Sequence, residues 1–137
     1  MAGLGYHVDI LTRQCEGQPA EEQVDDRVRV GLWRADDASG AWIVRVDAPF
    51  HGDPAPPGTP GPTPRLWDFE VVELFLLALP DTYLEVELGP HGHHLVLALR
   101  GVRRVVRGGL PLRYAAERRG GRWHGVAHVD AALVPEG

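Results

Sequence analysis

The sequence contains no lysine, a single cysteine and no long apolar run, and each of these absences limits what the protein can be. All 14 basic residues are arginine and the formal net charge is −5. The chain therefore lacks the basic excess that nucleic acid or an anionic membrane requires. Cys15 stands alone and cannot form an intrachain disulfide. We predict no nucleic-acid partner, no membrane partner and no dependence on an oxidising compartment.

Segments that would direct the chain to a membrane are also missing. The N-terminal residues reach Asp9 too early for the apolar part of a signal peptide. No apolar stretch approaches the length of a transmembrane helix. The use of arginine alone, with abundant alanine, glycine and proline, is typical of genomic base composition rather than of a function. We predict a soluble, cytoplasmic protein.

Short segments with a period of two dominate the sequence. Val28, Val30 and Leu32, for example, alternate with arginine or glycine, which is typical of a half-buried strand. No segment has a convincing helical period, and only residues 20–24 could form a single helical turn. We predict one all-β domain over residues 1–137, an antiparallel β-sandwich of seven or eight strands. Strands are expected at residues 6–11, 28–32, 42–48, 112–117 and 123–130, with three more within 66–100 and a strand or bend at 102–106.

Residues 49–65 form the one proline-rich segment, with seven of the 12 prolines and three glycines. Proline fixes φ and removes a hydrogen-bond donor, so this segment cannot be a helix or an interior strand. An interdomain linker is one interpretation. Because the strands on both sides fit one sandwich, we favour a long, stiff loop that crosses between the sheets. Such a loop could also form a wall of a binding site.

Residues 66–100 are the most strongly patterned part of the chain and carry the candidate site. A turn of odd length around Pro80 would pair Glu73 with Glu87 and would keep the leucines and valines of both strands on one core face. A two- or four-residue turn around residues 89–92 would then place His94 opposite Glu87. We therefore predict a row of Glu73, Glu87 and His94 across three strands on the solvent side, with Arg100 farther along that face.

Two glutamates directly opposite each other in a sheet repel and need a compensating group. The simplest interpretation is a row on an exposed sheet face that is either solvated or neutralised by arginines. A metal ion held by Glu73, Glu87 and His94 is the alternative, although their spacing matches no specific zinc signature. His91 and His93 add imidazole near the turn. Because His93 and His94 are neighbours in a strand and point to opposite faces, both cannot easily serve one site. Asp68 and Glu70 could also help to hold calcium or another divalent cation through oxygen ligands.

Sequence motifs for the common catalytic sites are absent. There is no nucleophile elbow, no phosphate-binding loop, no dinucleotide fingerprint and no zinc-protease motif. Directly opposed carboxylates would also be too close for most glycosidase arrangements. Catalysis is therefore disfavoured. Among the tryptophans, Trp67 follows the proline-rich segment and is the one we expect to be partly exposed.

Three segments resemble an uncharacterised protein family, that of the human chromosome 4 open reading frame 33 protein, which has bacterial members. They are DAPFHGDPAPPG, LWDFEVVELFLL and YLEVELGPHGHHLVLALRG, at residues 47–58, 66–77 and 83–101. The resemblance is dense over residues 44–101 and continues in register over 123–130. The family has no established activity to carry over. From this resemblance we expect a bacterial source, and a sandwich that either lacks the family's C-terminal strands or has a partner on the corresponding edge.

A more diffuse pattern resembles the family 9 carbohydrate-binding modules and the wider DOMON-like group. It rests on residues 67, 68, 73, 75 and 83 and on the Pro-His-Gly of the turn at 90–92. This resemblance implies a β-sandwich that binds a sugar or haem, often with calcium. It supports the fold more than the ligand.

Four functions remain open at this point. The first is a non-catalytic binding module for a saccharide or another small polar ligand. The others are a metal-binding protein or metal-dependent enzyme, a haem protein with histidine ligands, and an interaction domain that pairs by a sheet edge or as a homodimer. The candidate ligand-binding residues are Trp67, Glu73, Tyr83, Glu85, Glu87, His94 and Arg100.

Overall fold

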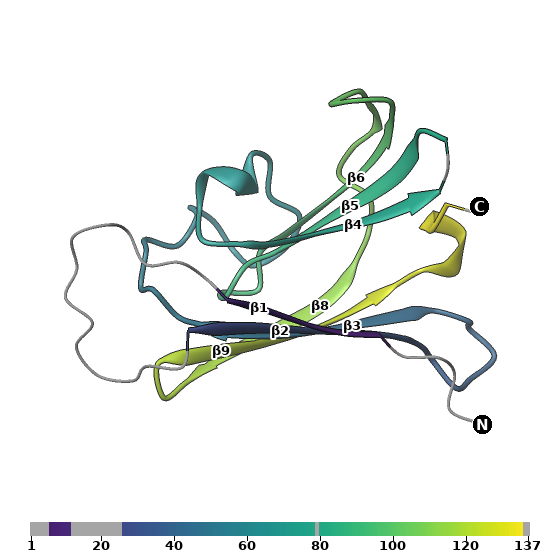
Figure 1. Ribbon diagram of the computed structural model, residues 1–137. Helices are drawn as coiled ribbons and strands as arrows, with labels where there is room; N and C mark the ends of the chain where they lie inside the picture. Colours follow the sequence, from purple (N-terminus) through teal and green to yellow (C-terminus); the bar gives the residue numbers. More distant parts are fainter. Residues whose placement is uncertain (1–5, 12–25, 79, 136–137) are drawn as a thin grey trace.

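The computed structural model describes residues 6–11, 26–78 and 80–135, and it shows two antiparallel sheets packed face to face (Figure 1). The five-stranded sheet has the order β1-β2-β3-β9-β8, and the four-stranded sheet has the order β4-β5-β6-β7. This confirms the predicted all-β sandwich, although nine strands are described where seven or eight were predicted. The strands are β1 (Tyr6–Leu11), β2 (Arg27–Arg34), β3 (Trp42–Pro49), β4 (Val72–Ala78), β5 (Thr82–Leu88), β6 (His94–Arg100), β7 (Val105–Arg107), β8 (Arg113–Arg119) and β9 (Arg122–Val129).

The core lies between the two sheets and follows from the alternation in the strands. In β9, buried residues alternate with half-buried ones along the whole strand, and the buried Trp123 is 1% exposed. Val46 of β3 and Val86 of β5 come from different sheets and belong to the same core cluster. Burying alternate apolar side chains from both sheets is the main stabilising contribution in such a fold.

Two short 3₁₀ helices complete the described elements, η1 (Leu66–Asp68) and η2 (Ala131–Leu133). In the part of the chain that the structure describes, no helix is long and apolar enough to cross a membrane. The helical turn predicted at residues 20–24 lies outside the described residues, as does Cys15.

The pairing of β4 with β5 is the one predicted from the sequence. Three residues, 79–81, connect the strands, and Glu73 pairs with Glu87. Phe75 likewise pairs with Glu85, and Leu77 pairs with Tyr83. The register keeps the even-numbered apolar residues of both strands on the core face, because a slip by one residue would bury the glutamates there.

The predicted pairing of β5 with β6 is wrong by one residue. His94 pairs with Leu88, and Glu87 pairs with Leu95. The connection has five residues, 89–93, rather than two or four, and the Gly89 amide donates to the His93 carbonyl at 2.9 Å to close it. Gly92 permits this shape because its φ is +94°. An odd connection moves His94 and Arg100 to the face opposite the glutamates.

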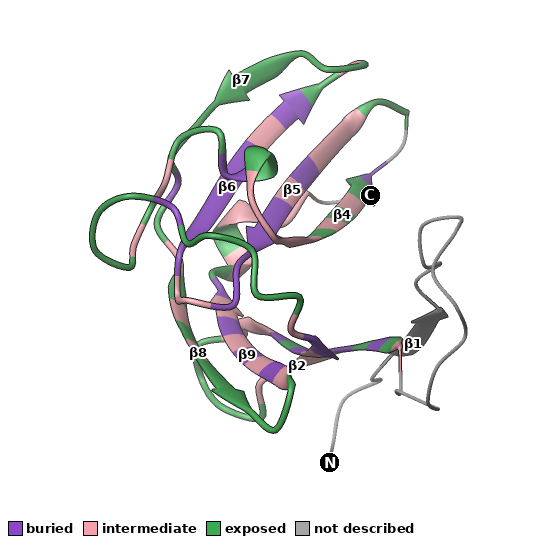
Figure 2. Ribbon diagram, turned by 90° about the vertical axis from the view of Figure 1, so that its left-hand side faces the viewer, coloured by how far each residue is buried: buried purple, intermediate pink, exposed green. Residues whose placement is uncertain are grey.

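The proline-rich segment returns across the outer face of the four-stranded sheet. The Thr63 amide donates to the His94 carbonyl at 2.9 Å, and the His94 amide donates to the Gly61 carbonyl at 3.1 Å, so the segment is tied to the start of β6. It then delivers Leu66, which is fully buried, onto a second apolar cluster, whose buried members on β6 are Leu95, Leu97 and Leu99. Strand β6 is consequently buried on both faces over most of its length (Figure 2).

Candidate functional site

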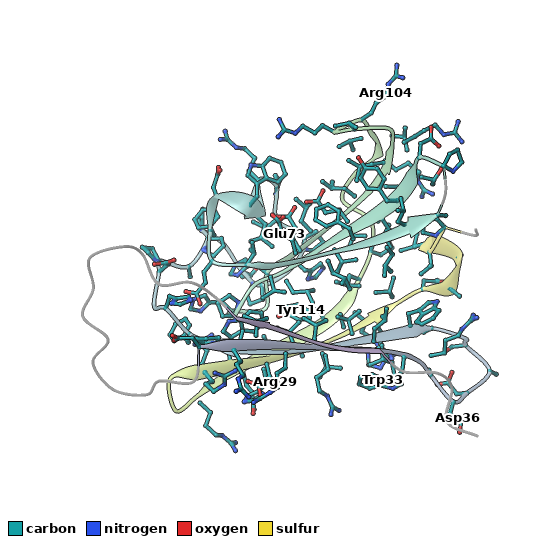
Figure 3. The ribbon with its side chains drawn as sticks, viewed as in Figure 1. Arg29, Trp33, Asp36, Glu73, Arg104 and Tyr114 are labelled. Carbon is teal, nitrogen blue, oxygen red and sulfur yellow. The ribbon has the colours of Figure 1, made fainter. Side chains whose placement is uncertain are left out.

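The outer face of the four-stranded sheet carries three glutamates on neighbouring strands. Glu73 lies on β4, while Glu85 and Glu87 lie on β5. One carboxylate oxygen from each residue lies within 4.8 Å of the others. Figure 3 shows the Glu73 side chain on the side of the sheet that faces away from the five-stranded sheet. We call these three residues the carboxylate cluster.

Glu87 is the buried member of the carboxylate cluster. Its exposed fraction is 0%, and neither carboxylate oxygen has a hydrogen-bond partner among the described residues. The second apolar cluster excludes water here, since Leu95 is the residue that pairs with Glu87 on β6. Burying an ionised carboxylate without a partner is costly. Glu87 therefore needs a proton or a ligand to offset its burial.

The protonation of the carboxylate cluster reflects this burial. Loss of solvation raises the pKa of Glu87 to about 7, and the charges of Glu85 and Glu73 act in the same direction. Burial also raises the pKa of Glu85, with a further contribution from Glu73. Within the described residues, no ion pair joins any of the three to an arginine or histidine. Neutralisation of the row by arginine, one of the two simple interpretations, is thus not found there.

An apolar recess of about 320 Å³ lies over β6, the strand next to the two glutamates of β5, and none of the three glutamates lines it. Leu95 and Leu97 form part of its floor and pair across the sheet with Glu87 and Glu85. Trp67, on η1, is 49% exposed and forms part of the wall. The recess is lined by Pro62, Thr63, Pro64, Arg65, Trp67, Leu95, Leu97 and Gly109.

The structure brings together three of the seven predicted ligand-binding residues, Glu73, Glu85 and Glu87, while Trp67 lines the recess. Tyr83 lies on the same face, but its hydroxyl is already used. It donates to the Gly101 carbonyl at 2.6 Å and accepts from the Arg103 amide at 3.2 Å. The tyrosine hydroxyl therefore holds the turn between β6 and β7.

His94 and Arg100 are placed away from the carboxylate cluster, which corrects the prediction. His94 is 5% exposed, and its ring lies edge-on to the Tyr114 ring at 5.9 Å on the core side of the sheet. Arg100 is exposed at the end of β6, where it pairs with Thr82. A metal site of Glu73, Glu87 and His94 is therefore contradicted by the register: Leu95 lies opposite Glu87 on β6, and the third carboxylate of the cluster is Glu85 on β5.

The other polar residues that were considered as candidate ligands form contacts within the loops. The Glu70 carboxylate accepts from the amides of His51 at 3.0 Å and Asp53 at 3.3 Å. Asp68 forms an ion pair with Arg65 at 3.1 Å. His93 is buried, with Nε2 3.3 Å from the Gly58 carbonyl. These contacts hold the proline-rich segment and engage the carboxylates of Asp68 and Glu70 within it.

Sequence reasoning missed the recess, because it treated the outer face as open to solvent. A signal was available in β6, where Leu95, Val96 and Leu97 form a continuous apolar run. Such runs are typical of strands that are buried on both faces. The run predicts a cover over the outer face, and the proline-rich segment is the part of the chain that supplies it.

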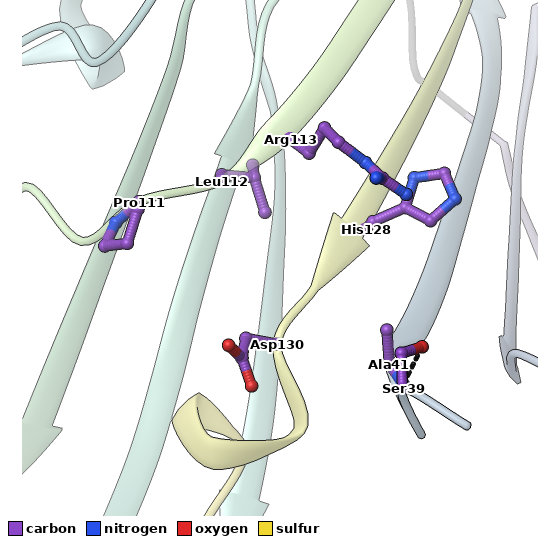
Figure 4. A pocket seen from close by; sticks show the side chains of 7 residues that line it. All are labelled: Ser39, Ala41, Pro111, Leu112, Arg113, His128 and Asp130. Carbon is purple, nitrogen blue, oxygen red and sulfur yellow. Dashed lines mark hydrogen bonds between the residues drawn. The ribbon is translucent and has the colours of Figure 1, made fainter. Parts of the chain in front are cut away.

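A second and larger pocket, of about 500 Å³, lies where β8 and β9 meet the turn between β2 and β3 (Figure 4). Asp130, the acidic residue of its lining, already accepts a hydrogen bond. The Asp130 carboxylate accepts from the Ala132 amide at 2.9 Å and caps η2. This larger pocket is lined by Ser39, Ala41, Pro111, Leu112, Arg113, His128 and Asp130. Because none of its side-chain polar atoms is both buried and unpartnered, we place the candidate site at the carboxylate cluster and the recess.

The chain is similar to UPF0462 protein C4orf33 from human and to its homologues from zebrafish (Danio rerio) and mouse. It is 48% identical to the human protein over 96 residues, 45% to the zebrafish protein over 98 residues and 48% to the mouse protein over 97 residues. These matches cover 67% to 69% of the chain. The chain spans about half the length of these curated relatives, between 48% and 50%.

These relatives support the predicted uncharacterised C4orf33 family. They are vertebrate proteins, which contradicts the expected bacterial source. No family model matches the chain. No solved structure matches it.

Proposed function

Because the relatives' name, UPF0462, states no activity, we propose a function from the site itself: a non-catalytic binding module that holds a small ligand in the recess. The observation that carries this proposal is an open apolar recess with an exposed tryptophan beside carboxylates that have no described ion pair. Apolar walls combined with a few convergent polar groups are typical of small-ligand sites.

The chemistry of the two halves suggests the class of ligand. Trp67 and the leucines offer an apolar surface, while the carboxylate cluster accepts hydrogen bonds from donors. A saccharide combines both features, since one ring face is apolar and the rim carries hydroxyl donors. The resemblance to family 9 carbohydrate-binding modules favours the same ligand class. A volume of about 320 Å³ is at the small end of the range for ligand sites, so a short saccharide suits it best.

We assign the site to binding rather than to hydrolysis. Retaining glycosidases hold their two carboxyl groups roughly 5–5.5 Å apart, and inverting enzymes hold them about 6.5–9.5 Å apart. Oxygens of all three glutamates lie within 4.8 Å of one another. None of the three glutamates lines the recess that would hold the saccharide, and we assign no catalytic residue.

The test is titration calorimetry with a panel of mono- and disaccharides, in a buffer that contains a chelator. We expect binding by the wild type that is lost in Trp67→Ala and kept in Trp33→Ala. Trp33 is a matched control, because it lies on the outer face of the other sheet beneath Arg45. Absence of binding by a correctly folded wild type, or equal loss in both variants, would contradict the proposal.

A further inference from the structure

We propose that Glu73, Glu85 and Glu87 form a binding site for one divalent, oxygen-preferring cation on the outer face of the four-stranded sheet. The proposal uses a different set of residues from the one that the sequence suggested, with Glu85 in place of His94. It does not depend on the saccharide proposed for the recess.

The buried carboxylate of Glu87 is the first observation that points to a ligand. Both oxygens are inaccessible to solvent, and neither has a partner among the described residues. An unsatisfied buried acceptor costs roughly 1–3 kcal/mol, and more when it is charged. A bound cation would coordinate these oxygens directly and remove this cost.

The pairing of β4 with β5 then supplies the other two carboxylates at a suitable distance. Glu73 lies directly opposite Glu87, and Glu85 lies two residues along the same face of β5. Without an ion, opposed like charges destabilise the sheet. With an ion between them, the 4.8 Å cluster of oxygens becomes a preformed set of ligands. The backbone holds this set, since all three residues lie within regular strands.

Competing cations are absent from the surroundings that the structure describes. Arg65, at the rim of the recess, is paired with Asp68 at 3.1 Å. Arg100 lies on the other face of the sheet, as β6 is registered. The described ion pairs include none with the carboxylate cluster. A divalent ion would therefore meet up to three negative charges without having to displace a described arginine from them.

The ligand atoms indicate which ions fit. An all-carboxylate set favours hard cations such as Ca²⁺, Mg²⁺ and Mn²⁺, whereas zinc and copper favour imidazole or thiolate ligands. Glu73 is exposed, so an ion can enter from its side and water can complete the coordination shell. Ca²⁺ and Mg²⁺ sites commonly keep such waters. The site thus resembles a half-open cation site more than an enclosed one.

The experiment is titration calorimetry of the chelator-treated 137-residue chain with Mn²⁺, Ca²⁺ and Mg²⁺. We expect one site per chain for at least one of these ions, and about a tenfold or greater loss of affinity in Glu87→Gln. Glu117→Gln is the matched control, since Glu117 is an exposed glutamate on β8 of the other sheet, and it should bind as the wild type does.

Outcomes that overturn the proposal are no ion binding by the folded wild type, or equal affinity in the wild type and Glu87→Gln. Circular dichroism checks the fold of each variant. If Glu87→Gln does not fold, Glu73→Gln replaces it, because Glu73 is exposed and tolerates substitution. The same loss of affinity is then expected, and retention of full affinity would overturn the site. Saccharide binding in chelator is measured separately, so failure of one proposal leaves the other distinguishable.

Discussion

The two outer faces of this sandwich treat their acidic residues in opposite ways. On the five-stranded sheet, Asp47 is contacted by Arg122 at 2.8 Å, by Arg29 at 3.9 Å and by His124 at 3.7 Å. On the four-stranded sheet, the carboxylate cluster has no described ion pair and includes a glutamate that is fully buried.

The difference arises from what lies over each face. The proline-rich segment places Leu66 on β6 and removes water from around Glu87, whereas Asp47 and its partners remain partly exposed. A carboxylate that is surrounded by arginines is explained by structure alone. A buried carboxylate beside two others and without a cation is not, and this contrast directs the search for a ligand to the four-stranded sheet.

The largest expected effect concerns Leu66, which covers the outer face of β6. Leu66→Ala should reduce the free energy of unfolding by about 2–4 kcal/mol, because it leaves a cavity over a fully buried cluster. Val126→Ala, on the half-buried outer side of β9, should cost less than about 1 kcal/mol. Urea denaturation at fixed pH measures both. Equal losses would mean that the two outer faces are covered alike.

The next effect concerns the buried charge. The pKa of Glu87 is about 7 in the folded chain and 4.5 in the reference state, so folding favours its protonated form. Its contribution to stability is complete below pH 4.5 and is lost as the pH rises through 7. In chelator, Glu87→Gln should therefore be more stable than the wild type at pH 8 by about 2–3 kcal/mol, and equal to it at pH 4.

Urea denaturation of both proteins from pH 4 to pH 8 measures this difference. Glu117→Gln serves as the control on the other face and should show no such trend, because Glu117 is exposed. A flat difference between wild type and Glu87→Gln across this range would show that Glu87 is solvated or paired.

A smaller effect is expected at Asp47, on the outer face of the five-stranded sheet. Asp47→Asn should destabilise the chain by about 1 kcal/mol, because it weakens a short, partly buried contact with Arg122. Since the contact is electrostatic and partly exposed, the loss should shrink in 1 M salt, where screening acts over about 3 Å. Denaturation at low and high salt measures it. A loss that does not depend on salt would argue against charge pairing at Asp47.

The smallest effect concerns the guanidinium of Arg45, which lies 5.3 Å from the centre of the Trp33 ring. The substitution Arg45→Met keeps most of the aliphatic contact with the Trp33 ring and removes the cation. The expected loss is about 0.5–1 kcal/mol. Thermal unfolding with Trp33→Leu and the double variant separates the pair from each side chain alone, and additive losses would show that the two do not interact.

The sequence contained enough information for the sandwich and for one of the two decisive registers. Between β4 and β5, burial of Leu74 and Val86 on one face leaves only one alignment that exposes the glutamates. Between β5 and β6, the apolar run of β6 fits either face, so the pattern could not choose between alignments. The conformation of Gly92 made the choice, through the length of the turn.

The recess could not be predicted for a related reason. Its wall comes from residues 62–67, which follow a proline-rich segment whose path no periodicity encodes. Trp67 was expected to be partly exposed and is so, but its position beside Leu95 and Leu97 depends on the long-range contacts of residues 61–63 with His94. Such contacts are tertiary, and the local pattern carries no signal for them.

The most direct test of the cation site uses Mn²⁺ as a paramagnetic probe in amide NMR spectra of the chain. We expect selective loss of signals around Glu73 on β4 and around residues 85–87 on β5. Signals around Asp47 on β3 and His124 on β9 should persist at the same Mn²⁺ concentration. Broadening centred on Asp47, or uniform broadening without preference for either sheet, would contradict the assignment of the carboxylate cluster as a cation site.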